Sequence, residues 1–193
     1  EGDSVSELLK INPEMDVICL PKNFGYTIAT NIGWKQAIKK LDAQYICAMD
    51  SDIITVQDNW LDLQIEELEK SAQRGISCGK LVFPDNRLNL LFLGRDPGNW
   101  EEKDEGQYDF VKEVEGVGGA CIIIKKAVIE KIGYYDENFF YGPNDVDYCL
   151  RAKKEGFKIL YHGLAKSIHN GSSSYLASNR THIFGPQAEG NII

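Results

Sequence analysis

The sequence lacks three features: a long apolar run, an excess of positive charge, and a pairing pattern among its cysteines. Apolar stretches such as 120–124 fall far short of the roughly 18 residues that a membrane-spanning helix needs. The chain has 21 Lys or Arg and 29 Asp or Glu in 193 residues, which gives a formal net charge of −8. A nucleic-acid backbone or an anionic membrane requires a basic surface, so this charge disfavours both as the main partner.

The cysteines are five in number and form no C-x-x-C pair. At least four of them lie in apolar, strand-like segments, which predicts buried thiols in a reducing compartment rather than disulfides or zinc ligands. The five cysteines are Cys19, Cys47, Cys78, Cys121 and Cys149.

Short apolar runs, polar turns and helix-period runs alternate along the chain, a pattern typical of a single soluble α/β domain. Strands are expected at 15–20, 45–49, 76–83, 120–124 and 157–161, and the continuous apolar character of 45–49 predicts burial on both faces. Helices are expected at 5–9, 26–41, 127–132 and 146–155, with one more that begins after Asp58 or Asn59 and ends at Gly75.

Two segments are less regular. The stretch 84–115 carries Pro, Gly and an acidic patch, and a connection of that length is usually functional or disordered. After His169 the composition turns to Ser, Asn and Gly. We therefore expect one domain over 1–175 and a loosely ordered tail over 176–193.

Asp50-Ser51-Asp52 follows directly on the strand expected at 45–49. In open α/β sheets, ligands bind outside the carboxyl ends of strands, and Mg²⁺ or Mn²⁺ prefers carboxylate oxygens. Aspartate is also common in turns after strands, and this second interpretation is favoured for the motif taken alone.

Asp145 and Asp147 lie at the start of the helix expected at 146–155. Asp145 is a good helix cap, and it could equally serve as a general base beside the aromatic segment 139–141. His169 follows the last expected strand and would become a metal ligand only if the fold brings it to Asp52.

Gly116, Gly118 and Gly119 precede the strand expected at 120–124 but lack the order of a dinucleotide-binding or P-loop motif. Close packing of the backbone, or its close approach to a substrate, explains these glycines better than phosphate binding does.

Taken in order, these segments resemble the family-2 glycosyltransferases, especially the rhamnosyltransferase-like members with the GT-A nucleotide-sugar fold. The resemblance covers about residues 1–174. The matching segments are Asn23-Phe24-Gly25, Asn31-Ile32-Gly33, Asp50-Ser51-Asp52, Gly118-Gly119-Ala120-Cys121, 132–140, Asp145-Val146-Asp147, 156–159 and His169.

The resemblance implies a mixed α/β sheet flanked by helices and a role for each matching position. Asp52 and His169 would bind Mn²⁺ or Mg²⁺, and Asp50 would contact the metal or the donor's ribose. Asp145 would be the catalytic base. The nucleotide or donor sugar would lie near Asn23, Gly25, Asn31, Gly118 and Gly119.

The implied reaction is inverting transfer of a sugar from a UDP-, dTDP- or GDP-linked donor to a glycan or lipid-linked acceptor. The resemblance also implies a role in bacterial cell-wall or polysaccharide biosynthesis in the cytoplasm. Peripheral attachment at the inner face of the membrane would come through the parent protein. The alternatives are an inactive sugar- or nucleotide-binding module and a haloacid-dehalogenase-like phosphatase. Ile54 disfavours the phosphatase, because its motif carries Thr or Val at that position.

Two departures from the family pattern stand out. Asn144 occupies a position where the family usually carries Glu, which could alter acceptor binding or the basicity of Asp145. The family also begins with a strand-helix-strand unit that we expect to be absent here, which would leave an open sheet edge and favour self-association.

Overall fold

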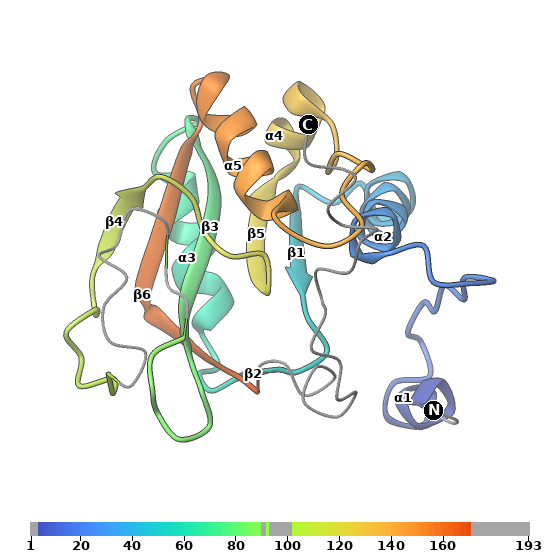
Figure 1. Ribbon diagram of the computed structural model, residues 1–193, viewed down its shortest axis with the longest axis horizontal. Coiled ribbons are helices and arrows are strands. Elements are labelled where there is room, and N and C mark those ends of the chain that lie inside the picture. The colour runs from blue at the N-terminus through green and yellow to red at the C-terminus, as the bar shows by residue number, and fades with distance from the viewer. Residues whose placement is uncertain (1–3, 90–91, 93–101, 171–193) are drawn as a thin grey trace.

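The computed structural model describes residues 4–89, 92 and 102–170, and these form a six-stranded mixed sheet with helices on both faces (Figure 1). The sheet order is β1-β5-β3-β6-β2, and β4 pairs with β6. The strands are β1 (Tyr45–Met49), β2 (Ile53–Thr55), β3 (Arg74–Val82), β4 (Val111–Val114), β5 (Cys121–Lys125) and β6 (Lys158–His169). The helices are α1 (Ser4–Ile11), α2 (Tyr26–Leu41), α3 (Trp60–Glu69), α4 (Lys126–Ile132) and α5 (Asn144–Lys154). The expected α/β fold class is confirmed.

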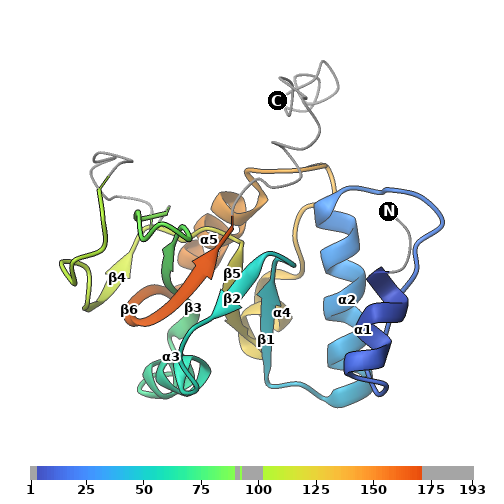
Figure 2. The same cartoon turned by 90° about the horizontal axis from the view of Figure 1, so that it is seen from below.

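The alternation of side chains along the central strands produces the layers. In β5, Ile122 and Ile124 face the larger hydrophobic cluster, whereas Ile123 packs on the other face with Leu68 of α3 and Leu160 of β6. Figure 2 shows α3 on one side of the sheet and α4 and α5 on the other. Both faces are therefore covered where β3, β5 and β6 run side by side.

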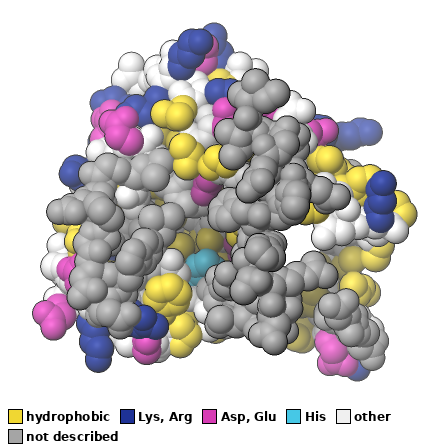
Figure 3. All heavy atoms as spheres, in the orientation of Figure 1, with side chains coloured by type: hydrophobic (Ala, Val, Ile, Leu, Met, Phe, Trp, Pro, Cys, Tyr) yellow, Lys and Arg dark blue, Asp and Glu magenta, His cyan; other side chains and the backbone are white. Residues whose placement is uncertain are grey.

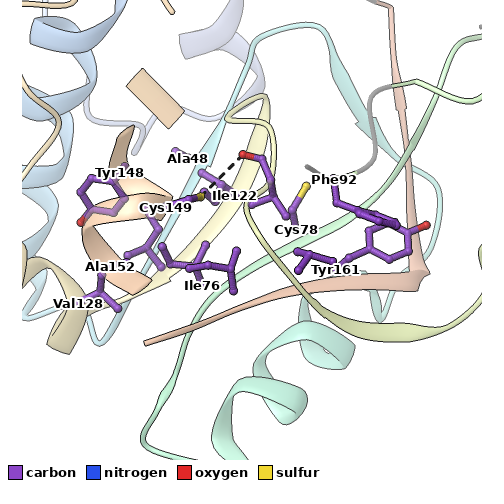
Figure 4. Packing of buried hydrophobic residues seen from close by; sticks show 14 of the residues in the cluster. Ala48, Ile76, Cys78, Phe92, Ile122, Val128, Tyr148, Cys149, Ala152 and Tyr161 are labelled. Carbon is purple, nitrogen blue, oxygen red and sulfur yellow. Dashed lines mark hydrogen bonds between the residues drawn. The ribbon is translucent and has the colours of Figure 1, made fainter. Parts of the chain in front are cut away.

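The larger cluster is shown in Figure 4, where side chains of β3 and β5 meet those of α4 and α5. Tyr148, Cys149 and Ala152 of α5 are fully buried against Ile76 of β3 and Ile122 of β5. Burial of large apolar side chains contributes roughly 1.5–3 kcal/mol each, so this contact fixes α5 on the sheet. It thereby also fixes the first turn of α5, which carries Asp145.

A break in strand register sets the direction of the end of β6. β3 and β6 run parallel from Ile76 onward, and the register shifts between Gly79 and Lys80, which pair with His162 and Lys166. A side chain at Gly79 would collide with the Ala165 carbonyl oxygen, so this position requires glycine. Beyond the bulge, β6 continues to His169 and pairs with β2.

The segment 15–20 is not a strand, contrary to the sequence prediction. It runs as an irregular, largely exposed connection, with Val17 and Ile18 38% and 47% exposed. No described strand pairs with it, and β-branched residues form a strand only where a neighbour supplies the hydrogen-bonding ladder. Among the described residues, β1 pairs only with β5. Its Cys47 and Met49 face outward and are exposed, so the predicted burial of this strand on both faces is wrong.

Other local predictions need smaller corrections. Two short strands, β2 and β4, were not predicted, and β4 lies inside the expected irregular stretch 84–115. α3 ends at Glu69, and Gly75 is a buried residue of β3, where an added Cβ would lie 2.5 Å from a Val128 methyl carbon. Five thiols are free as expected, but Cys19 and Cys47 are exposed. The expected tail 176–193 and the boundary at 175 lie outside the described residues.

A buried charge network holds the segment before β4 against the sheet. The Lys80 side chain in β3 is 2% exposed, and its Nζ lies 2.8 Å from Asp104 Oδ1 and also contacts Asp109. Lys166 of β6 donates to Asp104 Oδ2 at 2.8 Å. Burial alone would raise the pKa of Asp104, but the hydrogen bonds from Lys166 and Lys80 outweigh it and hold that pKa below its ordinary value.

Replacement of Asp104 by alanine removes the central carboxylate of this network. We expect Asp104→Ala to lower the free energy of unfolding by about 3 kcal/mol. Lys80 would stay buried and keep only Asp109 as a partner, and the Asp109 side chain is 44% exposed. Urea denaturation measures the difference. Asp85→Ala is the matched control, since it breaks an exposed ion pair with Arg87 in the same part of the chain and should change stability little.

The difference in unfolding free energy between wild type and Asp104→Ala should also depend on pH in a defined direction. Since the pKa of Asp104 is lowered in the folded state, its contribution is complete above about pH 4 and is lost as pH falls through the lowered pKa. The stability gap between wild type and Asp104→Ala should therefore narrow on acidification. A gap that widens as pH falls would contradict this assignment.

Candidate active site and metal centre

Asp50, Asp52 and His169 come together at one end of the sheet. Each offers one ligand atom, and these three atoms all lie within 4.8 Å of one another. Asp50 and Asp52 belong to the turn between β1 and β2, whereas His169 is the last residue of β6. The convergence that the sequence required of His169 and Asp52 is therefore present.

Strand pairing is what brings His169 to this turn. Ile53 of β2 pairs with His169 of β6, and the Asn170 N–H donates to the Asp52 carbonyl oxygen at 3.0 Å. On the other side, the Asp50 N–H donates to the Ala120 carbonyl oxygen at 2.8 Å, which anchors the turn at the start of β5. Backbone bonds at both ends thus fix the positions of all three side chains.

The three side chains form a partly desolvated donor set. His169 Nε2 lies 3.5 Å from Asp52 Oδ1, and these two side chains are 18% and 23% exposed. Burial raises the pKa of Asp50; nearby His169 opposes the rise, and the Asp52 carboxylate adds to it. Two carboxylates and an imidazole around one point suit a divalent cation such as Mn²⁺, which would relieve the repulsion between the carboxylates.

Asp145 lies in the first turn of α5, where the helix start favours a negative charge. Helix α5 begins at Asn144, so Asp145 is inside the helix rather than its cap. Its Oδ2 accepts a hydrogen bond from the Gly119 N–H at 2.9 Å, and its Oδ1 accepts one from the Val146 N–H at 2.8 Å. These bonds fix the carboxylate and leave further lone pairs on both oxygens.

A cavity of about 210 Å³ connects Asp145 with the cation-binding side chains. Asp50 and His169 line it together with Asp145. Its other lining residues are Tyr26, Leu81, Asn89, Gly118, Gly119, Ala120, Tyr141, Gly142 and Asn144. Figure 3 shows a histidine and acidic side chains within a hollow on this face of the molecule. One cavity therefore holds both a candidate base and two of the three candidate ligands.

A larger hollow of about 410 Å³ lies between α2 and β1. Its lining is mainly apolar and includes Asp50 but neither Asp145 nor His169. The smaller cavity is therefore the candidate active site.

The predicted donor-binding residues divide into two groups. Gly118 and Gly119 line the cavity, and a Cβ at Gly119 would lie 3.3 Å from the Asp145 Cβ. Asn23, Gly25 and Asn31 do not line it. The Asn31 amide is held by Tyr135 and Glu137, and the Asn23 side chain accepts a hydrogen bond from the Gly25 N–H.

Gly25 serves to bring α2 close to residue 140. Its φ is +88°, and an added Cβ would lie 2.6 Å from the Phe140 carbonyl oxygen. That same carbonyl accepts a hydrogen bond from the Tyr26 N–H at 2.9 Å. Gly25 thus positions Tyr26, which does line the cavity.

Several cavity residues were not predicted as site residues, among them Tyr26 and Asn89, and Tyr141 was noted only as part of the aromatic segment beside Asp145. Tyr26 donates to the Gly119 carbonyl oxygen at 3.3 Å, and burial, with the Asp50 charge adding to it, raises the pKa of its phenol. The position of Tyr141 beside the Asp145 segment was visible in the sequence. Asn89 carried no such signal, because it lies in the stretch 84–115, whose path the sequence does not predict.

Comparison with known proteins shows that the chain is similar to an O-antigen biosynthesis protein and to a hexosyltransferase. It is 24% identical over 176 residues to the O-antigen biosynthesis protein RfbC of Myxococcus xanthus, covering 85% of this chain and 13% of that protein. It is 23% identical over 159 residues to the low-salt glycan biosynthesis hexosyltransferase Agl10 of Haloferax volcanii, covering 77% and 49%. The chain thus spans about half the length of one relative and a small part of the other. No model of a known protein family matches it.

Solved structures of glycosyltransferases have a similar fold. GalNAc-T7 with UDP, GalNAc and Mn²⁺ superposes with a TM-score of 0.65 at 12% identity, covering 88% of this chain and 35% of that one. The mannosyltransferase PcManGT of Pyrobaculum calidifontis with GDP-Man and Mn²⁺ gives 0.59 at 13% identity, covering 90% and 45%. The fold is that of the GT-A glycosyltransferases, and the resemblance stated from the motifs is confirmed. Within the described part of the chain, no helix has the length and apolarity to cross a membrane.

The geometry predicts a divalent-cation site whose affinity depends on Asp52. We expect Asp52→Ala to weaken Mn²⁺ binding at least tenfold in calorimetry, because a charged ligand is lost. Asp58→Ala is the matched control, an exposed aspartate six residues further on whose loss should leave the affinity unchanged. Since the pKa of Asp50 is raised, protons should compete with Mn²⁺ at a higher pH than they would at an ordinary aspartate. Equal Mn²⁺ affinity in wild type and Asp52→Ala would contradict the site.

Proposed function

We propose that this chain transfers a sugar from a nucleoside-diphosphate sugar to an acceptor hydroxyl, with inversion at the anomeric carbon. The observation that carries this proposal is one cavity with a cation-binding set at one end and a fixed carboxylate on its wall. Sugar transfer from such a donor needs both features. The leaving diphosphate requires positive charge, and the attacking hydroxyl requires a base.

Asp50, Asp52 and His169 would hold Mn²⁺ or Mg²⁺ at the end of the cavity. The bound cation would act as a Lewis acid that neutralises the negative charge on the departing diphosphate. The chain's own task is to keep the three side chains converged, which the β2–β6 pairing and the Asp50–Ala120 backbone bond achieve.

Asp145 supplies the base. Its carboxylate accepts the proton of the acceptor hydroxyl while the hydroxyl oxygen forms a bond to the anomeric carbon. The bond from that carbon to the diphosphate oxygen breaks, and the nucleoside diphosphate leaves with the electron pair. The hydrogen bonds from Gly119 and Val146 orient the carboxylate for this step.

The positions of the two groups support inversion at the anomeric carbon. One carboxylate on the wall of the cavity and a leaving-group site at its end favour a single displacement, in which the acceptor attacks the face opposite the diphosphate. The logic matches inverting glycoside hydrolysis, with an acceptor hydroxyl in place of water.

The donor and acceptor classes rest on the comparisons. The superposing structures contain UDP with GalNAc and GDP-Man, which supports UDP- and GDP-linked sugars as donors. The proposal of dTDP-linked sugars rests on the motif resemblance alone. The names of the relatives refer to O-antigen and glycan biosynthesis, which supports a glycan or lipid-linked sugar as the acceptor.

Replacement of the base gives the most specific test of this function. We expect Asp145→Asn to lower the rate of nucleotide release from UDP-GalNAc or GDP-mannose by about 10²–10⁴-fold, while Mn²⁺ binding stays unchanged. Asp147→Asn is the matched control and should leave the rate of nucleotide release unchanged. Asp147 lies two residues further along α5 and pairs with Arg151 at 2.8 Å. Equal rates in Asp145→Asn and wild type would contradict the proposed base.

The alternative of a binding module without turnover gives a different result. Such a module would show Mn²⁺-dependent heat on titration with UDP or GDP but no nucleotide release from any donor.

Anomeric coupling constants in the product, measured by proton NMR, then test the stereochemistry. A product that retains the donor's configuration would contradict the single displacement.

A further inference from the structure

Asn89 contacts the imidazole of His169 from the side opposite the carboxylates. It lies just beyond the bridge between Val82 and Leu88, its side chain is mostly buried, and it lines the cavity. Its amide nitrogen Nδ2 lies 3.0 Å from His169 Nδ1. The other ring nitrogen, Nε2, faces Asp52.

The contact between Asn89 and His169 bears on which ring nitrogen can bind a cation. A neutral imidazole carries one proton, and only the nitrogen without it offers a lone pair to a metal. A cation between Asp50, Asp52 and His169 would need the lone pair on Nε2, so the proton must be on Nδ1. Nδ1 then requires a hydrogen-bond acceptor, and Asn89 is the side chain placed against it.

We infer that Asn89 is a positioning residue of the cation site, acting through the tautomer of His169. Without a cation, the amide N–H donates to Nδ1 and the ring proton lies on Nε2, toward Asp52. When a cation binds, a rotation of the amide by 180° presents Oδ1 to the Nδ1–H group, and Nε2 is free to ligate. An amide can serve both states because it carries a donor and an acceptor on one planar group. The inference rests on the metal site of the proposed function.

The backbone around Asn89 is held without its side chain. The Asn89 N–H donates to the Leu81 carbonyl oxygen at 3.0 Å, and the Leu88 N–H donates to the Glu102 carbonyl oxygen at 2.8 Å. Loss of the amide should therefore leave the path of this segment intact. Its effect on the cation site should act through the orientation and tautomer of the imidazole, as for other groups that orient metal-ligating histidines.

Two substitutions separate the amide's role from a packing role. Asn89→Leu keeps the volume and removes both hydrogen-bonding atoms, whereas Asn89→Asp keeps the acceptor. We expect Asn89→Leu to weaken Mn²⁺ binding about 10–100-fold in calorimetry, and Asn89→Asp to restore binding to at least the wild-type level. Asn138→Leu, which replaces an exposed amide outside the cavity, should leave the affinity unchanged. Wild-type affinity in Asn89→Leu would overturn the inference.

Nitrogen-15 NMR of the imidazoles reads the tautomer directly. The chain has three histidines, so His169→Ala assigns the relevant signals. Cation-free wild type should carry the proton on Nε2 and move it to Nδ1 on saturation with Mg²⁺. Asn89→Asp should carry it on Nδ1 in the absence of a cation.

The two readouts distinguish failure of this inference from failure of the proposed function. If wild type binds no Mn²⁺, the metal-dependent function fails, and the spectra of the cation-free protein still decide whether Asn89 sets the tautomer of His169. Identical His169 spectra in wild type, Asn89→Leu and Asn89→Asp would overturn that role. A wild-type protein that binds Mn²⁺ with the proton still on Nε2 would overturn it as well.

Discussion

The pairing of β2 with the end of β6 is the constraint on which the site depends. It sets Ile53 opposite His169 and joins Asn170 to Asp52 through the backbone. Only this pairing brings an imidazole from the end of the sheet's longest strand to two carboxylates in a turn far earlier in the sequence. The pairing in turn requires the register shift in β6, and that shift requires the glycine at position 79.

The peptide segment before β5 links the candidate cation-binding side chains to the proposed base. The Ala120 carbonyl accepts a hydrogen bond from the Asp50 N–H, and the neighbouring Gly119 N–H donates to the Asp145 carboxylate. Two adjacent residues thus fix the Asp50 turn and the Asp145 carboxylate relative to each other. Glycine at 119 suits this place, because a side chain there would press against Asp145. Burial of α5 against β3 and β5 keeps Asp145 in reach of that segment.

The sequence predicted the parts of this structure that depend on local pattern. Continuous apolar runs located β1 and β5, helical periodicity located α2, and the turn after β1 was a cation-site candidate. It failed where tertiary pairing decides. The apolar segment 15–20 is not a strand because no described strand pairs with it, whereas short β2 is a strand because β6 does. The contacts of the Asn31 amide with residues 135 and 137 also span more than 100 residues of chain and could not be predicted, whereas its assignment to donor binding stays a prediction. Asn89 could not be found, since its role depends on a contact across 80 residues of chain.

The central claim is that Asp50, Asp52 and His169 share one cation beside Asp145. Anomalous diffraction from crystals of the chain grown with Mn²⁺ and UDP tests it directly. The account predicts a single strong manganese peak within coordination distance of all three side chains, with the diphosphate extending into the cavity that Asp145 lines. A manganese ion bound to other groups, or a diphosphate located away from this cavity, would contradict the account.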